Sequence, residues 1–130
     1  MSFQRVFTDT PWEKKVGYCR AVRAGDHIYI TGTAPVDEAG RTVAPGDGYA
    51  QANRCLEIID QTLTKLGADG TCVVRTRMLV TDITRWEDFG RAHAEYFSDH
   101  PPATTMVQVQ ALIDPDMLIE IEADAVCRDD

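Results

Sequence analysis

The sequence predicts an α+β fold in which one mixed β-sheet carries two helices on one face. Several segments alternate apolar and polar residues as strands do, and two longer segments repeat apolar residues at helical spacing. Strands separate the two helical segments. The chain has 130 residues, of which 44% are hydrophobic, so a core can form without disulfides. We expect one domain over residues 1–130.

The first predicted element is a β-hairpin over residues 18–35. Its strands, residues 18–23 and 27–31, are separated by Ala24-Gly25-Asp26, which has the composition of a turn. The segment Thr-Gly-Thr-Ala-Pro at residues 31–35 ends the second strand. An additional strand is expected at residues 3–7.

The next element is an amphipathic helix that begins after Asp47 and ends at Gly67. Asp47 follows a loop rich in proline and glycine and carries the side chain of a helix N-cap. Glycine is a common stop after the last turn of a helix. The apolar stripe of this helix consists of Ala52, Leu56, Ile59, Leu63 and Leu66.

A strand, a second helix and two final strands complete the predicted fold. Residues 73–80 are rich in β-branched side chains and alternate, and residues 84–98 have helical periodicity. Pro101-Pro102 breaks the chain, after which we expect strands at residues 104–110 and 118–127. The stripe expected to be buried in the second helix consists of Trp86, Phe89, His93, Tyr96 and Phe97.

Alternation also assigns strand side chains to the two faces of the sheet. In strand 73–80 we expect Val74, Thr76, Met78 and Val80 on the helix side, and Val73, Arg75, Arg77 and Leu79 on the far side. The far face is then predicted to collect Arg75, Arg77, Thr104, Met106, Gln108, Gln110, Glu120, Glu122 and Asp124. Such a mixed polar face is typical of an oligomer interface with a wet pocket.

Composition argues against several classes of function. The net charge is −8, and residues 111–130 hold seven acidic side chains against one basic, so a nucleic-acid partner is not expected. The chain shows no membrane-spanning run and no signal peptide, which indicates a cytoplasmic protein. The four cysteines lie far apart, so we expect free thiols and no zinc site.

Four short segments occur in an order that identifies a family. They are Gly17-Tyr18 before the hairpin, Tyr-Ile-Thr-Gly-Thr-Ala-Pro at 29–35, the strand from Val73 through Ile83, and Pro102-Ala103 ahead of Ile-Glu-Ile-Glu-Ala at 119–123. In this order they resemble the Rid family of reactive-intermediate deaminases, also called YjgF or endoribonuclease L-PSP proteins. The resemblance spans nearly the whole chain.

The resemblance implies a chorismate-mutase-like fold and a homotrimer, in which three sheets form a central barrel and small-molecule clefts lie between subunits. It also implies hydrolysis of imines and enamines to 2-keto acids and ammonia, without metal or cofactor. The family motif Pro-Ala-Arg-Ser pairs its arginine with the substrate carboxylate, whereas this chain has Pro102-Ala103-Thr104-Thr105. Losing that charge reduces affinity for a carboxylate by roughly 10- to 150-fold or more.

Glu120 is the candidate catalytic residue. By resemblance, its carboxylate orients or activates the hydrolytic water, and partial burial raises the pKa of a carboxyl group toward that role. The structural alternative is an ion pair between Glu120 or Glu122 and Arg75 or Arg77 on a neighbouring strand.

Tyr18, Thr31 and Gly32 are candidate ligand-binding residues. By resemblance, Tyr18 covers the ligand, and a backbone amide at Thr31-Gly32 holds a carboxylate oxygen, where glycine lets a ligand approach closely. Side-chain packing for Tyr18 and a tight strand end for Gly32 remain the alternatives.

Four further ligand-binding candidates are Arg77, Trp86, Thr104 and Met106. By resemblance, Thr104 and Met106 replace the family's arginine and cysteine, and Trp86 reaches the cleft from the neighbouring subunit. A place in the helix core is the alternative for Trp86. Arg77 is predicted to share a face with Thr104, which makes it a candidate for a relocated anion anchor, with an ion pair as the alternative.

These residues predict a hydrolase of the imine or enamine deaminase type. The missing arginine argues against the standard reaction on 2-aminoacrylate. A non-catalytic protein that binds a small ligand or assists a pathway is the main alternative. An endoribonuclease or translation inhibitor is a third, which the acidic balance disfavours.

Overall fold

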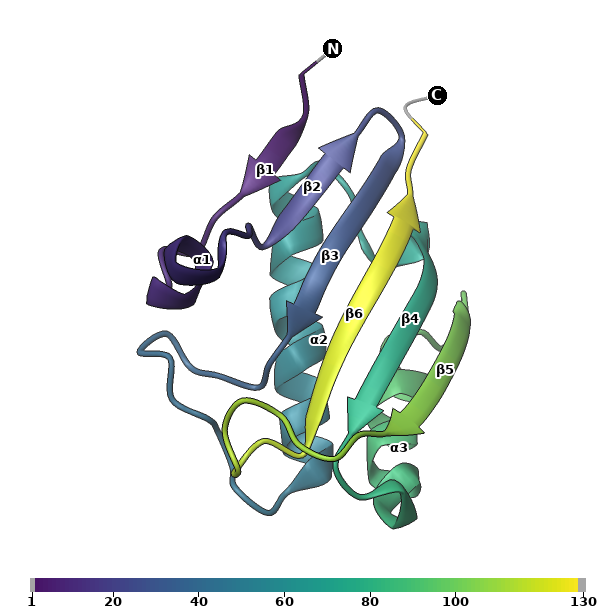
Figure 1. The fold of residues 1–130 in the computed structure, drawn as a ribbon. Helices are drawn as coiled ribbons and strands as arrows, with labels where there is room; N and C mark the ends of the chain where they lie inside the picture. The colour runs from purple at the N-terminus through teal and green to yellow at the C-terminus, as the bar shows by residue number, and fades with distance from the viewer. Residues whose placement is uncertain (1, 129–130) are drawn as a thin grey trace.

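Two helices, α2 (Gly48–Lys65) and α3 (Trp86–Tyr96), lie across one face of a six-stranded sheet (Figure 1). The computed structural model describes residues 2–128. Its other elements are β1 (Gln4–Val6), α1 (Pro11–Val16), β2 (Ala21–Ala24), β3 (His27–Thr33), β4 (Val73–Val80), β5 (Ala103–Gln108) and β6 (Ile119–Val126). Two short 3-10 turns, Gly70–Cys72 and Ile83–Arg85, precede β4 and α3.

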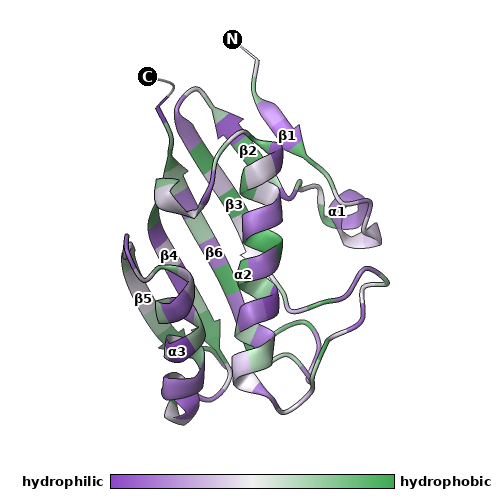
Figure 2. Ribbon diagram, turned by 180° about the vertical axis from the view of Figure 1, so that it is seen from behind, coloured by the Kyte–Doolittle hydropathy of each residue, from purple (hydrophilic) through white to green (hydrophobic). Residues whose placement is uncertain are grey.

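The strand order is β1-β2-β3-β6-β4-β5, in which β4 and β5 pair parallel and every other pair is antiparallel. Figure 2 views the molecule from the helix side and shows α2 across the middle of the sheet, with α3 beside it over β4 and β5. The predicted α+β fold, with one mixed sheet and two helices on one face, is confirmed. The other face carries no helix in residues 2–128 (Figure 1).

Helix α2 forms as the sequence predicts. The Asp47 carboxylate accepts a hydrogen bond from the Ala50 amide at 3.0 Å and so caps the first turn. After the last turn, Gly67 has a φ of +76°, which glycine adopts without steric cost. The stripe from Ala52 to Leu66 is buried against the sheet.

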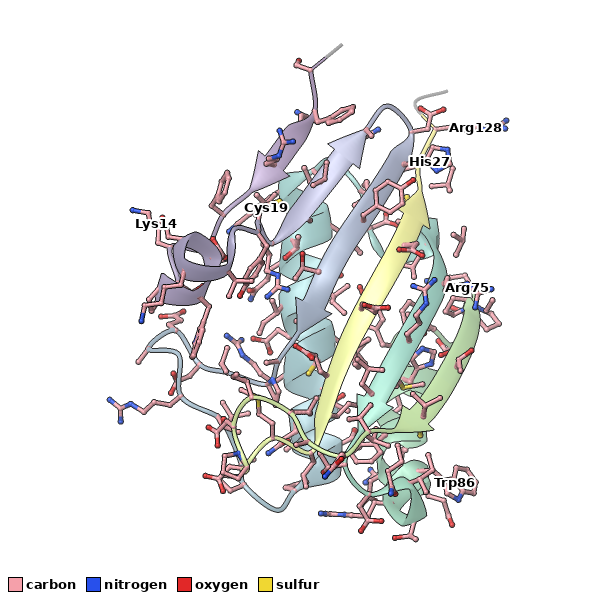
Figure 3. All side chains as sticks on the ribbon, in the orientation of Figure 1. Lys14, Cys19, His27, Arg75, Trp86 and Arg128 are labelled. Carbon is pink, nitrogen blue, oxygen red and sulfur yellow. The ribbon has the colours of Figure 1, made fainter. Side chains whose placement is uncertain are left out.

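Helix α3 begins at Trp86, two residues later than predicted. The Asp82 side chain accepts from the Thr84 amide and caps the 3-10 turn that precedes the helix. Phe89 and His93 are buried as expected. Trp86, however, is 56% exposed and projects outward from the start of α3 (Figure 3). A place in the helix core is therefore wrong for Trp86.

The N-terminal region contains the expected strand, β1, and one helix that the sequence analysis missed. The six-residue α1 has proline at its first position, and Gly17 ends it with a φ of +88°. Because α1 is so short, it has no repeated apolar stripe from which to predict it. The hairpin strand β2 starts only at Ala21, so Tyr18 lies in the connection between α1 and β2.

A β-bulge changes the predicted faces at the start of β4. Val73 pairs with Ala125 and Arg75 with Asp124, so Val74 is an extra residue in β4. Val73 is consequently buried and Val74 is exposed, the reverse of the prediction. From Thr76 to Val80 the predicted alternation is confirmed.

The predicted face of β5 is also wrong. In the parallel register, Thr104 pairs with Thr76 and Met106 with Met78, and paired residues share a face. Thr76 and Met78 are buried under the helices, so Thr104, Met106 and Gln108 lie on the helix side. Gln110 lies beyond the end of the strand. A shift of one residue in register moves a whole strand to the other face, and the sequence pattern did not specify this register.

Candidate functional site

A second bulge, in β3, shapes the open face of the sheet. Ile30 pairs with Ala123 and Thr33 with Ile121, so β3 has one more residue than β6 between these pairs. Ile30 and Thr33 are both buried, whereas Thr31 and Gly32 between them are only partly covered. Bulges re-aim a strand locally, and this one brings the Gly32 backbone against the polar side of β6.

Glu120 lies directly against this bulge. A Cβ atom built onto Gly32 would lie 3.1 Å from both Cδ and Oε1 of Glu120, so glycine leaves room for the carboxyl group. Burial raises the pKa of Glu120, Arg20 lowers it and Glu122 raises it further, with a net increase. The predicted combination of partial burial and a raised pKa is therefore present.

The structural ion pair weighed for Glu120 is absent within residues 2–128. Glu120 faces Leu79 across the β6–β4 pair, and no described group donates a hydrogen bond to its carboxylate. Arg77 instead lies 3.4 Å from a carboxylate oxygen of Glu122 and 3.2 Å from one of Asp124. The ion-pair alternative thus applies to Glu122, whereas Glu120 keeps its oxygens available.

Arg20, which the sequence analysis missed, also contacts this bulge. Its Nη2 atom donates to the carbonyl oxygens of Thr31 at 2.9 Å and Gly32 at 2.6 Å. Burial lowers the pKa of Arg20, opposed by the charges of Tyr18, Glu13 and Glu120. The sequence could have predicted this contact, because the tight turn of the hairpin sets a register in which Arg20 lies opposite Thr31.

Thr31 in β3 contacts the connection between α1 and β2, which contains Tyr18. The Thr31 hydroxyl donates to the Cys19 carbonyl at 2.7 Å, which ties β3 to the segment before β2. The Tyr18 amide donates to the Glu13 carbonyl at the end of α1. Tyr18 and Cys19 also line a cavity of about 530 Å³ beside α1. Figure 3 shows Cys19 between α1 and β2.

Comparison with known proteins decides the family. The family model described as endoribonuclease L-PSP matches residues 10–127. The chain belongs to the endoribonuclease L-PSP family. The resemblance to the Rid or YjgF proteins is therefore confirmed, and the match includes every candidate site residue.

Individual proteins similar to this chain agree with this result. A YjgF-family protein from Mycobacterium tuberculosis has a solved structure that superposes with a TM-score of 0.88 at 42% identity, covering 96% of this chain and 99% of that chain. The 3-aminoacrylate deaminase RutC of Acinetobacter baylyi is 35% identical over 104 residues, which are 80% of this chain and 82% of that protein. An uncharacterised Streptomyces coelicolor protein is 32% identical over 122 residues, covering 94% of this chain and 90% of that protein.

In this endoribonuclease L-PSP chain, the remaining candidates lie away from Glu120. The sheet order places β6 and β4 between β3 and the edge strand β5, so Thr104 and Met106 are separated from β3 by two strands and lie on the opposite face from Glu120. Trp86 is near that edge, at the start of α3 (Figure 3). A single copy of the chain therefore brings Glu120 to the bulge at Thr31 and Gly32, with Tyr18 in the connection that Thr31 bonds, but it does not bring Thr104, Met106 or Trp86 there.

A chain of hydrogen bonds holds Thr104 in place. The Thr76 hydroxyl lies 2.7 Å from the Thr104 hydroxyl and 2.8 Å from Nε2 of His93. Thr76 and His93 are buried, and burial lowers the pKa of His93, so its imidazole is neutral at pH 7. Thr104 itself is exposed. It offers a neutral hydroxyl at the exposed end of this chain of hydrogen bonds.

Within residues 2–128, no group of three or more His, Cys, Asp or Glu side chains is arranged to hold a metal ion. Over the same residues, none of the helices has the length and apolar character needed to cross a membrane.

Proposed function

We propose that this protein hydrolyses small imines or enamines, with Glu120 positioning and activating the attacking water. One observation carries this proposal. The Glu120 carboxylate is partly buried against Gly32, yet it is paired with no cation and accepts no hydrogen bond from residues 2–128. A carboxylate with free oxygens and a raised pKa is suited to accept a proton from water near neutral pH.

The reaction needs few groups. An enamine first takes a proton from solvent on carbon and becomes an iminium ion. Water then adds to the iminium carbon as one of its protons passes to Glu120, which gives a neutral carbinolamine. Return of this proton from Glu120 to the nitrogen expels ammonia, and the hydroxyl proton passes to Glu120 and on to solvent as the carbonyl product forms. A carboxylate that acts alternately as base and acid is sufficient for these proton transfers.

The relative from Acinetobacter baylyi supports the reaction class. Its name describes a deaminase acting on 3-aminoacrylate, which is an enamine. The 35% identity supports the same type of chemistry in this chain, while the substrate of this chain is tested separately below.

The site is proposed to lie between the subunits of a homotrimer. Glu120 lies on the open face in the interior strand β6, whereas Thr104 lies on the helix side in the edge strand β5, so a cleft that includes both residues requires a second copy of the chain. The open face of the sheet, which no helix covers in the described residues, offers a surface for such an assembly (Figure 1). Sedimentation equilibrium is expected to report a trimer, and a monomer would contradict the proposal.

The function is tested by adding the protein to 2-aminoacrylate and 3-aminoacrylate generated in situ and following release of ammonia. We expect acceleration over buffer, and we expect Glu120→Gln to lower kcat by about 10²- to 10⁴-fold because the amide cannot accept the proton. Unaccelerated hydrolysis of both compounds would overturn the proposal.

Glu122→Gln is the matched control. It makes the same change two residues away on the same face of β6, at a carboxylate already paired with Arg77. Its activity is expected to stay within about threefold of wild type, since an exposed ion pair contributes only about 0–1 kcal/mol. Equal losses in the two variants would show that Glu120 has no special role.

A second function is favoured by Thr104. Because a neutral hydroxyl occupies the position of the family arginine, the cleft can also serve to bind a small ligand without converting it. Saturable binding of a 2-keto acid by a protein that accelerates neither hydrolysis would favour this function over the first.

A further inference from the structure

The hydrogen bonds of His93 lead from the interior to the exposed edge of the sheet. Nε2 of His93 in α3 lies 2.8 Å from the Thr76 hydroxyl in β4, which donates to the Thr104 hydroxyl in β5 at 2.7 Å. His93 and Thr76 are buried, whereas Thr104 is exposed on the edge strand. A buried imidazole is therefore linked to a hydroxyl that a ligand can reach.

The direction of these hydrogen bonds follows from the number of hydrogens. A hydroxyl group has one hydrogen, and that of Thr76 goes to Thr104. Thr76 must therefore accept from His93, so Nε2 carries the ring hydrogen. Burial lowers the pKa of His93, so the ring is neutral at pH 7 and Nδ1 has no hydrogen. Nδ1 is not a buried atom without a partner in residues 2–128, so this tautomer leaves no buried nitrogen unsatisfied.

The hydroxyl hydrogen of Thr104 has no protein acceptor within residues 2–128. Thr104 accepts from Thr76, and its own hydroxyl donates to none of the described groups. Because Thr76 directs a hydrogen at the Thr104 oxygen, the hydrogen of Thr104 points away from Thr76, toward the exposed side of β5. A hydroxyl that accepts a hydrogen bond is polarised and donates a stronger one. Thr104 thus presents a fixed, neutral donor at the edge of the sheet.

Thr105, the next residue of β5, shows what this arrangement adds. It is also an exposed threonine, but it lies on the other face of the sheet and its side chain bonds none of the described groups. Its hydroxyl is free to rotate, and a ligand that binds it must first fix that rotation. The two side chains are chemically identical, so the difference between them comes from Thr76 and His93.

We propose that Thr104 donates its hydroxyl hydrogen to an acceptor atom of the bound ligand, and that His93 is a positioning residue that directs this hydrogen through Thr76. The inference rests on the proposed function, which includes Thr104 in the intersubunit cleft, and adds a specificity-determining contact to it. A neutral donor bonds an uncharged carbonyl oxygen without needing a negative charge to balance it. The ligand group at Thr104 is therefore an uncharged hydrogen-bond acceptor.

The first test is the tautomer of His93 in the ligand-free protein. The chain has three histidines, and the ring resonances of His93 in ¹⁵N-labelled wild type are assigned by their loss in His93→Gln. We expect the ring hydrogen on Nε2 and none on Nδ1 at pH 7. A hydrogen on Nδ1 would overturn the inference, because Nε2 would then accept from Thr76 and Thr76 could not donate to Thr104.

The second test is calorimetric titration with 2-oxobutanamide, an uncharged analogue of a hydrolysis product. Thr104→Val keeps the shape of the side chain and removes the donor, so we expect binding to weaken by about 3- to 10-fold. Thr104→Ser should restore affinity to within about twofold of wild type. Thr105→Val is the matched control and should bind as wild type does. The inference is wrong if wild type does not bind this amide or if Thr104→Val binds it equally well.

The role of His93 is tested by its coupling to Thr104. His93→Leu removes the donor to Thr76, and we expect binding of 2-oxobutanamide to weaken by about 2- to 5-fold. The double variant His93→Leu/Thr104→Val should lose no more affinity than Thr104→Val alone, because His93 acts only through Thr104. His93→Gln, whose amide can donate to Thr76, should stay within about twofold of wild type. Additive losses in the double variant would contradict a positioning role.

These outcomes are distinct from those that decide the proposed function. Turnover in wild type and its loss in Glu120→Gln decide whether the protein hydrolyses enamines. A protein that hydrolyses them with no contribution from Thr104 fails only the inference about Thr104 and His93. A protein that binds 2-oxobutanamide through Thr104 and hydrolyses neither enamine fails only the proposed function. The tautomer is measured in wild type, so it decides the direction of the hydrogen bonds even where His93→Leu does not fold.

Discussion

Two polar clusters on opposite faces of the sheet differ in how completely their hydrogen bonds are made. On the helix side, His93, Thr76 and Thr104 form a continuous chain in which each side chain has a partner. On the open side, Arg20 has a buried Nε without a partner and Glu120 accepts no hydrogen bond from the described residues. The first arrangement stabilises the fold, and the second leaves donors and acceptors for a ligand.

The largest effect on stability is expected from breaking the hydrogen-bond chain of His93, Thr76 and Thr104 on the helix side. Thr76→Val preserves volume but leaves Nε2 of the buried His93 without a partner, so the free energy of unfolding should fall by about 1–3 kcal/mol. Chemical denaturation measures it. Thr105→Val is the control, because Thr105 is exposed on the neighbouring strand β5, and its effect should stay within about 0.5 kcal/mol. Equal losses would mean that the chain of hydrogen bonds adds no stability.

An intermediate effect is expected in the pH dependence of the open cluster. The Glu120 base must be ionised, and its pKa is raised, so kcat/KM should fall on the acid side at a pH above the ordinary glutamate value. Because Arg20 lowers the pKa of Glu120, Arg20→Lys should leave this acid limb nearly in place and Arg20→Gln should move it to higher pH. An acid side of the kcat/KM profile at the same pH in wild type, Arg20→Lys and Arg20→Gln would show that Arg20 does not affect the pKa of Glu120.

The smallest effect is expected at the Arg77 ion pairs on the same open face. The side chains of Arg77 and Glu122 are 41% and 37% exposed, so water and salt screen their interaction. Arg77→Ala should lower the free energy of unfolding by about 0–1 kcal/mol, and less in high salt. Urea denaturation at low and high sodium chloride measures this. A loss above about 2 kcal/mol, independent of salt, would show that Arg77 does more than pair with surface carboxylates.

The sequence was sufficient for the long elements. Helix α2 and strands β4 and β6 bury one side along most of their length, so apolar residues recur at a period that predicts both the element and its face. Glu120 and Gly32 were chosen as site candidates from the sequence because each lies in a segment that resembles a family motif.

The features that were missed depend on contacts between strands. The face of β5 is set by its parallel register against β4, which the composition of residues 104–110 does not contain. Arg20 appears in the sequence as one charged residue among several in a hairpin. Its role depends on the bulge at Gly32, which becomes visible only when β3 is paired with β6. Trp86 was assigned to the core by periodicity, but the turn capped by Asp82 places it on the outside.

The parallel register of β5 also affects how this edge tolerates insertions and deletions. Thr104 and Thr105 point to opposite faces, so loss of one residue from the loop at 97–102 would bring Thr105 to the place of Thr104 beside Thr76. Since both are threonine, a hydroxyl would again meet Thr76. Gain of one residue would instead bring Ala103 there, which has no hydroxyl. The doubled threonine therefore preserves the polar chain against a deletion in this loop but not against an insertion.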